Sequence, residues 1–159
     1  MNPTVQIRRV SSDRQMTQAL AIRLRVFVKE QNVSADIELD SDDTRAIHFL
    51  AIAAGRAVGT ARLVLHGGSA KIGRMAVLKT HRGKGVGRQL LQRAIAAAKK
   101  LGAKKIYLHA QVAVIGFYEK LQFRGVGPVF DEAAIPHRKM AYDARGFKRV
   151  NRNKKAQHK

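Results

Sequence analysis

The sequence contains no cysteine and no tryptophan, and only three of its 159 residues are proline. The absence of cysteine excludes disulfide bonds and thiol nucleophiles, and it removes the ligand that structural zinc sites most often use. We therefore expect no metal site. The sequence has no run of 18 uncharged apolar residues, and its first residues lack a basic segment followed by a long apolar one. These features predict a cytoplasmic chain with neither a membrane span nor a signal peptide.

Acidic residues are scarce, with 11 Asp and Glu against 31 Lys and Arg, which gives a formal net charge of +20. Residues 44–118 contain 14 Lys and Arg and no acid, and residues 145–159 contain seven more cations. Five of the acids fall within eight residues, namely Asp36, Glu38, Asp40, Asp42 and Asp43. The chain is therefore a basic body with one acidic segment and one basic tail.

The length and the 45% apolar content predict one domain with a substantial core, because two domains would need a longer chain. We place this domain at residues 1–143. Residues 144–159 are rich in Lys, Arg, Asn and Gln, and we expect them to form a flexible, basic C-terminal tail.

The clearest functional signal is a glycine-rich, basic stretch, Arg82-Gly83-Lys84-Gly85-Val86-Gly87. Glycine lets the backbone turn tightly and approach a ligand without a Cβ in the way. The N–H groups at the start of a following helix favour an anion, above all a phosphate. A P-loop is excluded because no Lys-Ser/Thr pair follows these glycines. A dinucleotide site is excluded because residues 44–118 hold no carboxylate for the ribose.

What remains is the pattern Arg-x-x-Gly-x-Gly, after a strand-like stretch at 72–78. A second block follows, with a strand-like stretch at 106–111 and then Gly-Phe-Tyr-Glu-Lys-Leu-Gln-Phe at 116–123. Together the two blocks resemble the acetyl-CoA-binding core of the GNAT acetyltransferase superfamily. Residues 24–31, the acidic segment and Ile-Pro-His at 135–137 resemble its ElaA-like branch. The resemblance covers residues 4–142, and Gln122 departs from it by replacing the usual Gly.

This resemblance implies an α/β GNAT fold, with a mixed, mostly antiparallel sheet of six to seven strands and about four flanking helices. Its central strands splay apart, and the pantetheine of acetyl-CoA lies in the gap. Acetyl-CoA would be the co-substrate of an N-acetyltransferase that acts on an amine. The implied acid that protonates the leaving thiol is Tyr118, and the N–H of Val77 is the implied oxyanion donor. The implied cofactor-binding residues are Met75, Ala76, Val77, Arg82, Gly83, Lys84, Gly85, Val86, Gly87 and Arg88.

Apolar periodicity and turn residues give the order of elements. We expect strands over 5–10, 46–54, 58–65, 70–78, 105–110, 123–130 and 137–142, with a hairpin turn at 66–69. We expect helices over 16–30, 86–101 and 114–121, and a polar, acidic loop over 31–44. The helix over 86–101 should bury one stripe of side chains: Val86, Leu90, Leu91, Ala94, Ile95, Ala98 and Leu101.

Two features leave alternatives open. The general base has five candidates: Glu30, His48, His109, Glu132 and His137. Each histidine could instead serve only as a hydrogen-bonded structural residue. The acidic segment could select a cationic acceptor by reversing the field of a basic body, or it could be an ordinary solvated loop.

The net charge also permits functions from other classes. One alternative is a basic module that binds nucleic acid or the ribosome, although the sequence lacks the interleaved aromatic residues of stacking platforms. Another is a catalytically silent acyl-CoA-binding protein. The basic tail could hold a nucleic acid or an acidic partner beside an active enzyme. We expect no membrane partner, and the oligomeric state stays open, with a homodimer as one option.

Overall fold

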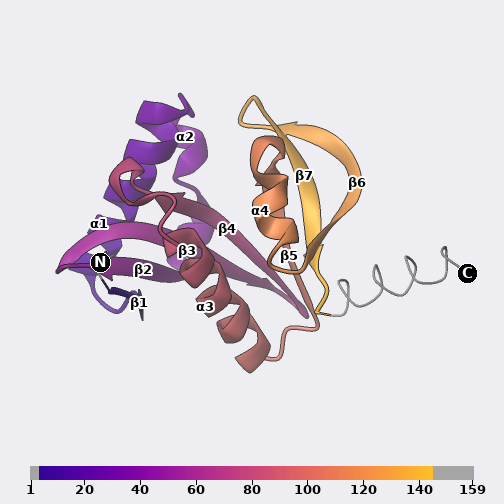
Figure 1. Cartoon of the computed structure of the whole chain (residues 1–159), viewed down its shortest axis with the longest axis horizontal. Helices are drawn as coiled ribbons and strands as arrows, with labels where there is room; N and C mark the ends of the chain where they lie inside the picture. The colour runs from indigo at the N-terminus through magenta and orange to yellow at the C-terminus, as the bar shows by residue number, and fades with distance from the viewer. Residues whose placement is uncertain (1–3, 145–159) are drawn as a thin grey trace, which may run out of the picture. The chain divides into compact units, whose positions relative to one another are not determined.

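A computed structural model describes residues 4–144 (Figure 1). The chain divides into two compact units, the first ending at Lys104 and the second beginning at Lys105. The predicted basic tail, apart from Ala144, lies outside the described residues.

The first unit contains a four-stranded antiparallel sheet. Its strands are β1 (Val5–Arg9), β2 (Ile47–Ala53), β3 (Arg56–His66) and β4 (Ser69–Val77), which pair in sequence order. Two-residue turns connect the last three strands because Ala53 pairs with Arg56 and His66 pairs with Ser69. The predicted hairpin turn at 66–69 is therefore confirmed.

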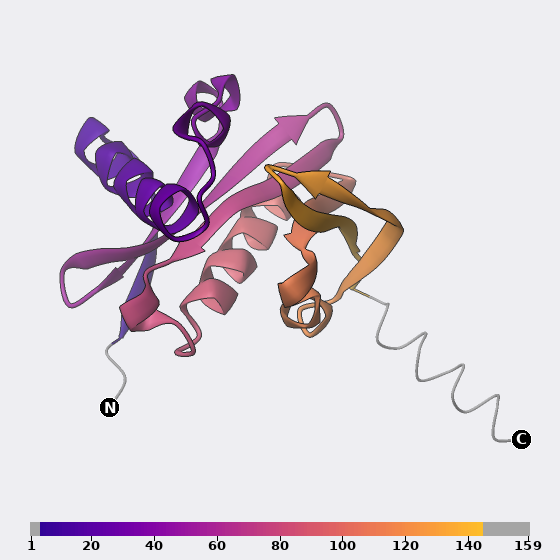
Figure 2. The ribbon, with the colours of Figure 1, turned by 90° about the horizontal axis from the view of Figure 1, so that it is seen from above.

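Two long helices cover this sheet, with α1 (Asp13–Arg23) on one face and α3 (Val86–Lys100) on the other (Figure 2). The Ser12 side chain caps α1 by accepting a hydrogen bond from the Gln15 N–H. A π-helical segment, Leu24–Glu30, continues α1 directly. The helix predicted over 16–30 is thus confirmed, but it begins three residues earlier, and its last two turns are π-helical.

The buried stripe of α3 packs closely on the sheet. Six of its seven predicted residues are buried, whereas Leu101 is 50% exposed because the helix ends at Lys100. Gly59 on β3 permits this close packing, since a Cβ at that position would lie 3.0 Å from Leu90 Cδ1 and 3.2 Å from Val86 Cγ1. The α3 N-terminus is thereby held at a fixed place beside β3.

The segment predicted as an acidic loop is partly helical, so that prediction is wrong in its local structure. It forms a short helix, α2 (Ala35–Glu38), and a 3₁₀ turn, Ser41–Thr44. The Asp40 side chain caps the 3₁₀ turn by accepting a hydrogen bond from the Asp42 N–H, and the Asp43 side chain accepts one from the Asp40 N–H. The Asp40 and Asp43 carboxylates therefore have local hydrogen-bond partners.

The second unit contains three antiparallel strands and one short helix. The strands are β5 (Lys105–Gln111), β6 (Phe123–Glu132) and β7 (Ile135–Tyr142), and β7 lies between the other two. A 3₁₀ turn, Val112–Val114, leads into α4 (Ile115–Glu119). The predicted pairing of the two closing strands is confirmed. The described residues thus form seven strands in total.

Candidate active site

The glycine loop presents backbone N–H groups at the start of a 15-residue helix. Gly83 and Gly85 have φ of 75° and 82°, a region that other residues rarely adopt, and Gly85 is the N-cap of α3. A Cβ at either glycine would meet no atom within 4 Å, so backbone conformation rather than space requires glycine there. Gly85 has no side chain that could cap the first N–H groups of α3, which leaves them available to an anion.

The cations of this loop do not all point the same way. Lys84 and Arg88 are exposed. Arg82 instead donates from Nε to the Val77 carbonyl at 2.8 Å and from Nη2 to Glu30 Oε2 at 2.7 Å. Arg82 therefore ties the loop to the end of β4 and to the π-helical segment, and Lys84 and Arg88 are the cations best placed to attract a phosphate.

The last residues of β4 follow a β-bulge. Thr60 pairs with Ala76 and Arg62 pairs with Gly73, so Arg74 and Met75 together oppose the single residue Ala61. Arg74 takes φ of 49°, which is uncommon for a residue with a Cβ. The bulge bends β4 at Met75, the first of the three β4 residues predicted to bind the cofactor.

Beyond the bulge, Val77 turns its backbone groups away from β3. Leu78 donates its N–H to the Val58 carbonyl at 2.9 Å, and Val77 lies opposite Gly59 in the next register position. In an antiparallel pair, residues whose backbone groups bond to the partner strand alternate with residues whose backbone groups point away from it. The N–H and C=O of Val77 therefore point to the other edge of β4. Arg82 satisfies the carbonyl at that edge. The Val77 N–H points to the same edge of β4.

The acidic segment is held by buried arginines. Arg23, which is fully buried, donates to Glu38 at 2.8 Å and to Asp43 at 2.7 Å. Arg62 on β3 pairs with Asp40 at 2.6 Å and Asp43 at 3.0 Å. Four of the five clustered acids have an arginine partner, and Asp36 is exposed. The interpretation as a solvated loop is therefore wrong, and little charge remains to reverse the field of the basic body.

The same network reaches the bulge in β4. Arg74 contacts Glu38 Oε2 at 3.2 Å and Asp40 Oδ2 at 3.0 Å, and its Nε donates to the Glu38 carbonyl at 3.1 Å. Burial raises the pKa of Glu38, which is 3% exposed, despite its arginine partners. Burial acts on Asp43 in the same direction, but the hydrogen bonds and charges of Arg23 and Arg62 outweigh it and lower its pKa to about 2. The segment 35–44 thus stabilises the bulge through the contacts of Glu38 and Asp40 with Arg74.

Tyr118 lies on α4 in the second unit and is half-buried. Its ring makes edge contacts with Phe117 and Phe123, with centroids 5.0 and 6.1 Å apart. Burial raises the pKa of the Tyr118 hydroxyl to about 12. The side chain combines an aromatic packing role with a hydroxyl that keeps its proton at neutral pH, as a proton donor must.

Two of the five base candidates lie in the first unit, and both are engaged. Glu30 pairs with Arg82 at 2.7 Å. His48 is 5% exposed, and its Nε2 lies 2.9 Å from the Asp43 carbonyl. Burial lowers the pKa of His48, so it stays neutral and structural.

The other three candidates, His109, Glu132 and His137, come together in the second unit. Glu132 Oε1 lies 3.1 Å from His109 Nδ1, and its Oε2 lies 3.6 Å from His137 Nε2. Sequence reasoning named each residue separately but did not foresee this cluster, because the three residues lie on different strands.

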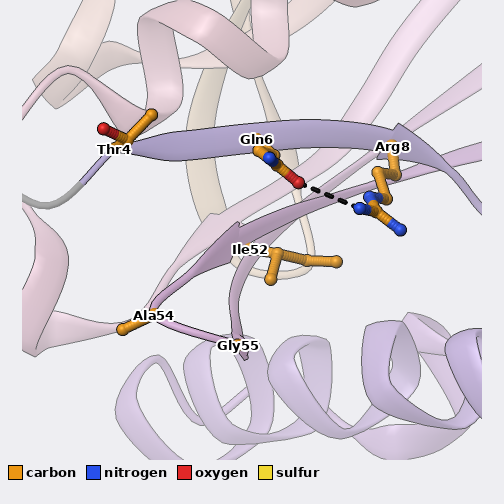
Figure 3. Close-up of a pocket in the computed structure, with 6 residues that line it drawn as sticks. All are labelled: Thr4, Gln6, Arg8, Ile52, Ala54 and Gly55. Atoms are coloured by element: carbon orange, nitrogen blue, oxygen red, sulfur yellow. Dashed lines mark hydrogen bonds between the residues drawn. The ribbon is translucent and has the colours of Figure 1, made fainter.

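A shallow cavity of about 410 Å³ lies elsewhere, at the outer edge of the first unit's sheet (Figure 3). Gln6 and Arg8 of β1 line it and are joined by a 3.0 Å hydrogen bond. None of the sequence-predicted site residues lines this cavity, so it does not belong to the candidate site. Within residues 4–144, no helix is long and apolar enough to cross a membrane.

Comparison with known proteins agrees with the sequence resemblance. Residues 15–123 match the family model described as Acetyltransferase (GNAT) family. The chain is 35% identical over 133 residues to an uncharacterized N-acetyltransferase, YjcF, of Bacillus subtilis, covering 83% of this chain and 95% of that one. It is 32% identical over 133 residues to protein ElaA of Escherichia coli, covering 80% and 86%.

Solved structures show the same fold. The crystal structure of a putative N-acetyltransferase from Lactobacillus plantarum matches with a TM-score of 0.81 and 30% identity, covering 87% of this chain and 97% of that one. The crystal structure of E. coli ElaA matches with a TM-score of 0.79 and 28% identity, covering 88% and 100%. The predicted α/β fold is therefore confirmed.

Proposed function

Because the chain belongs to the Acetyltransferase (GNAT) family and is an acyltransferase of its ElaA-like branch, we propose that it transfers an acetyl group from acetyl-CoA directly to an amine. The observation that carries this proposal is the glycine loop, with its left-handed glycines, its uncapped helix N-terminus and its exposed cations. These features supply N–H groups and positive charge for the pyrophosphate of CoA.

Acetyl transfer in this scheme needs no covalent enzyme intermediate, which suits a chain without cysteine. The neutral amine attacks the thioester carbonyl carbon, the C–N bond forms, and the C–S bond breaks. The Val77 N–H stabilises the developing oxyanion. The Tyr118 hydroxyl gives its proton to the leaving thiolate, the proton lost by the amine nitrogen passes to water, and water returns a proton to the Tyr118 oxygen. The backbone of Met75, in the bulge, and of Ala76, just beyond it, binds the pantetheine arm.

The amine acceptor is a small cationic amine or a peptide or protein amine. The acidic segment gives little support for selection by charge, since arginines neutralise most of its carboxylates. Fold alone does not decide between them.

The test is release of the CoA thiol from acetyl-CoA by the full chain, with spermidine and a lysine-containing peptide as probe acceptors. We expect acceptor-dependent thiol release and an acetylated product by mass spectrometry for at least one probe. Tubes without acceptor measure background hydrolysis of the thioester. Thiol release that no amine accelerates, with no acetylated product, would contradict the proposal.

A further inference from the structure

The Arg82 guanidinium is held between a backbone oxygen and a side-chain oxygen, and all three groups belong to the first unit. Its Nε donates to the Val77 carbonyl at 2.8 Å, and its Nη2 donates to Glu30 Oε2 at 2.7 Å. A guanidinium is a rigid planar fork, so two bonds from different nitrogens fix its orientation. Glu30 therefore helps to decide where a cation of the glycine loop points.

The peptide group between Val77 and Leu78 is bonded at both of its ends. Its carbonyl accepts from Arg82, and its N–H, which belongs to Leu78, donates to the Val58 carbonyl at 2.9 Å. A rotation of this peptide plane would break one of the two hydrogen bonds. The plane adjoins the N–H of Val77, so the bond from Arg82 helps to fix the backbone of the proposed oxyanion donor.

The π-helical geometry of residues 24–30 directs Glu30 to Arg82. In an α-helix residues seven apart share one face, and Arg23 and Glu30 are seven apart. Arg23 is fully buried, whereas the Glu30 side chain is 34% exposed. The wider π turn thus separates two side chains that α-helical winding would place on the same face. π-helical turns are frequent at functional sites.

Apolar packing holds the π-helical segment beside the end of β4. Val26 and Ala76 are buried in one hydrophobic cluster, and Phe27 and Leu78 pack against it. The two backbones that carry the acceptors of Arg82 therefore share one core. The carboxylate and the carbonyl form a preformed pair of acceptors for this guanidinium.

The carboxylate beside Arg82 also competes with the phosphate groups of CoA. Carboxylates and phosphates bind a guanidinium through the same kind of charge-assisted hydrogen bond. The Arg82 and Glu30 side chains are 42% and 34% exposed, so a dissolved anion can reach the pair. While Glu30 holds Arg82, the phosphate groups depend on the α3 N-terminus and on the other cations of the loop.

We propose that Glu30 is a positioning residue of the acetyl transfer, whose carboxylate keeps Arg82 on the Val77 carbonyl and off the phosphate groups of CoA. This inference rests on the proposed function. Removing the charge of Glu30 misplaces the oxyanion donor, which slows the transfer. It also releases Arg82 to the phosphates, which strengthens CoA binding. These two effects have opposite signs, whereas loss of a merely structural residue weakens both steps.

The test compares Glu30→Gln with the wild-type full chain in steady-state kinetics with the amine probes and in titration calorimetry with free CoA. We expect kcat to fall by about tenfold, less than the loss of about 100-fold or more that follows removal of a whole oxyanion donor. We expect the Kd for CoA to fall by roughly twofold to fivefold, the range of one exposed ion pair. The control is Asp13→Asn, which removes an exposed carboxylate at the start of α1 and should change neither value.

Arg82→Lys separates action through Arg82 from any other role of Glu30, because lysine keeps the charge but lacks the planar fork. Adding Glu30→Gln to Arg82→Lys should cause little further loss of kcat. Urea unfolding should show that Glu30→Gln is folded and nearly as stable as the wild type, because exposed ion pairs contribute little to stability.

Three results would each overturn the proposal: an unchanged kcat for Glu30→Gln, weaker CoA binding by this variant, or independent losses of kcat in the double variant. If the wild type acetylates a probe, any of these results leaves the proposed function standing. If the wild type acetylates no probe, the proposed function fails, and the CoA affinity of Glu30→Gln alone decides whether Glu30 restrains Arg82.

Discussion

Arg82 donates from Nε to the carbonyl oxygen of Val77 at 2.8 Å, so the first cation of the glycine loop binds the strand before it. The contact joins the two parts of the proposed cofactor site, the end of β4 and the loop that leads into α3. It also fixes the backbone of Val77, whose N–H is the proposed oxyanion donor. The positive charge that attracts the phosphate groups of CoA therefore comes from Lys84 and Arg88.

Replacing Lys84 and Arg88 with alanine should weaken acetyl-CoA binding. Both residues are exposed beside the α3 N-terminus. We expect the Kd to rise by roughly threefold to tenfold for the double variant, and the difference to shrink at high salt, because exposed charges are screened. Titration calorimetry at low and high salt measures this. Lys100→Ala, in the last turn of the same helix, is the control, and an equal effect there would contradict a local role.

Tyr118→Phe should lower kcat by about 100-fold without changing the KM for acetyl-CoA. Burial raises the pKa of Tyr118 to about 12, so the hydroxyl stays protonated as pH rises toward that value. The wild-type rate should therefore show no fall between about pH 8 and 10 from loss of this proton. Tyr142→Phe, in the same unit, is the control. A Tyr118→Phe enzyme with unchanged kcat would leave Tyr118 as a packing residue only.

Gln122→Gly should stabilise the protein. Gln122 has φ of 73°, a conformation that costs a residue with a Cβ about 1 kcal/mol relative to glycine. The lost side-chain contact, from the Tyr142 hydroxyl at 3.2 Å, is exposed and contributes little. Urea unfolding should show a gain of up to about 1 kcal/mol. Gln89→Gly, inside α3, should instead lower the free energy of unfolding by a similar amount. A lower free energy of unfolding for both variants would contradict the claim that positive φ strains Gln122.

Asp43→Asn should lower stability at neutral pH by about 2 kcal/mol, since the pKa of Asp43 falls from 3.8 to about 2 in the fold. A depressed pKa contributes stability that is present above pH 3.8 and is lost as pH falls toward 2. The difference between wild type and Asp43→Asn should therefore narrow over that range in urea unfolding. Asp131→Asn, which changes an exposed carboxylate, is the control variant. If the difference in unfolding free energy between wild type and Asp43→Asn stayed constant from pH 3.8 to 2, the stabilising role of the ionised Asp43 carboxylate would be disproved.

The sequence predicted the features that depend on local pattern. The glycine loop, the buried stripe of α3 and the hairpin at 66–69 could be predicted, because each depends on glycine positions or apolar periodicity within a few residues of sequence. Gln122, which stands where the family usually has Gly, has a positive φ of 73° that favours glycine.

The features that depend on long-range contact were not predictable. Arg23, Arg62 and Arg74 lie on three different elements, and nothing in their spacing indicates that they share the same carboxylates. The turn at Ala133 and Ala134 carries no Asn or Gly signal, so sequence reasoning could not foresee its geometry. The contact of His109 with Glu132 joins side chains from two different strands, so local sequence patterns did not predict it.

Titration calorimetry with acetyl-CoA and with free CoA, near physiological salt, tests the central claim most directly. We predict saturable binding at one site per chain for the wild type and no binding for Gly85→Glu, because glutamate cannot easily adopt φ of 82° and would place a negative charge at the helix N-terminus. Circular dichroism confirms that the variant is folded. Absence of saturable binding by a folded wild-type protein would contradict the assignment of acetyl-CoA as its co-substrate.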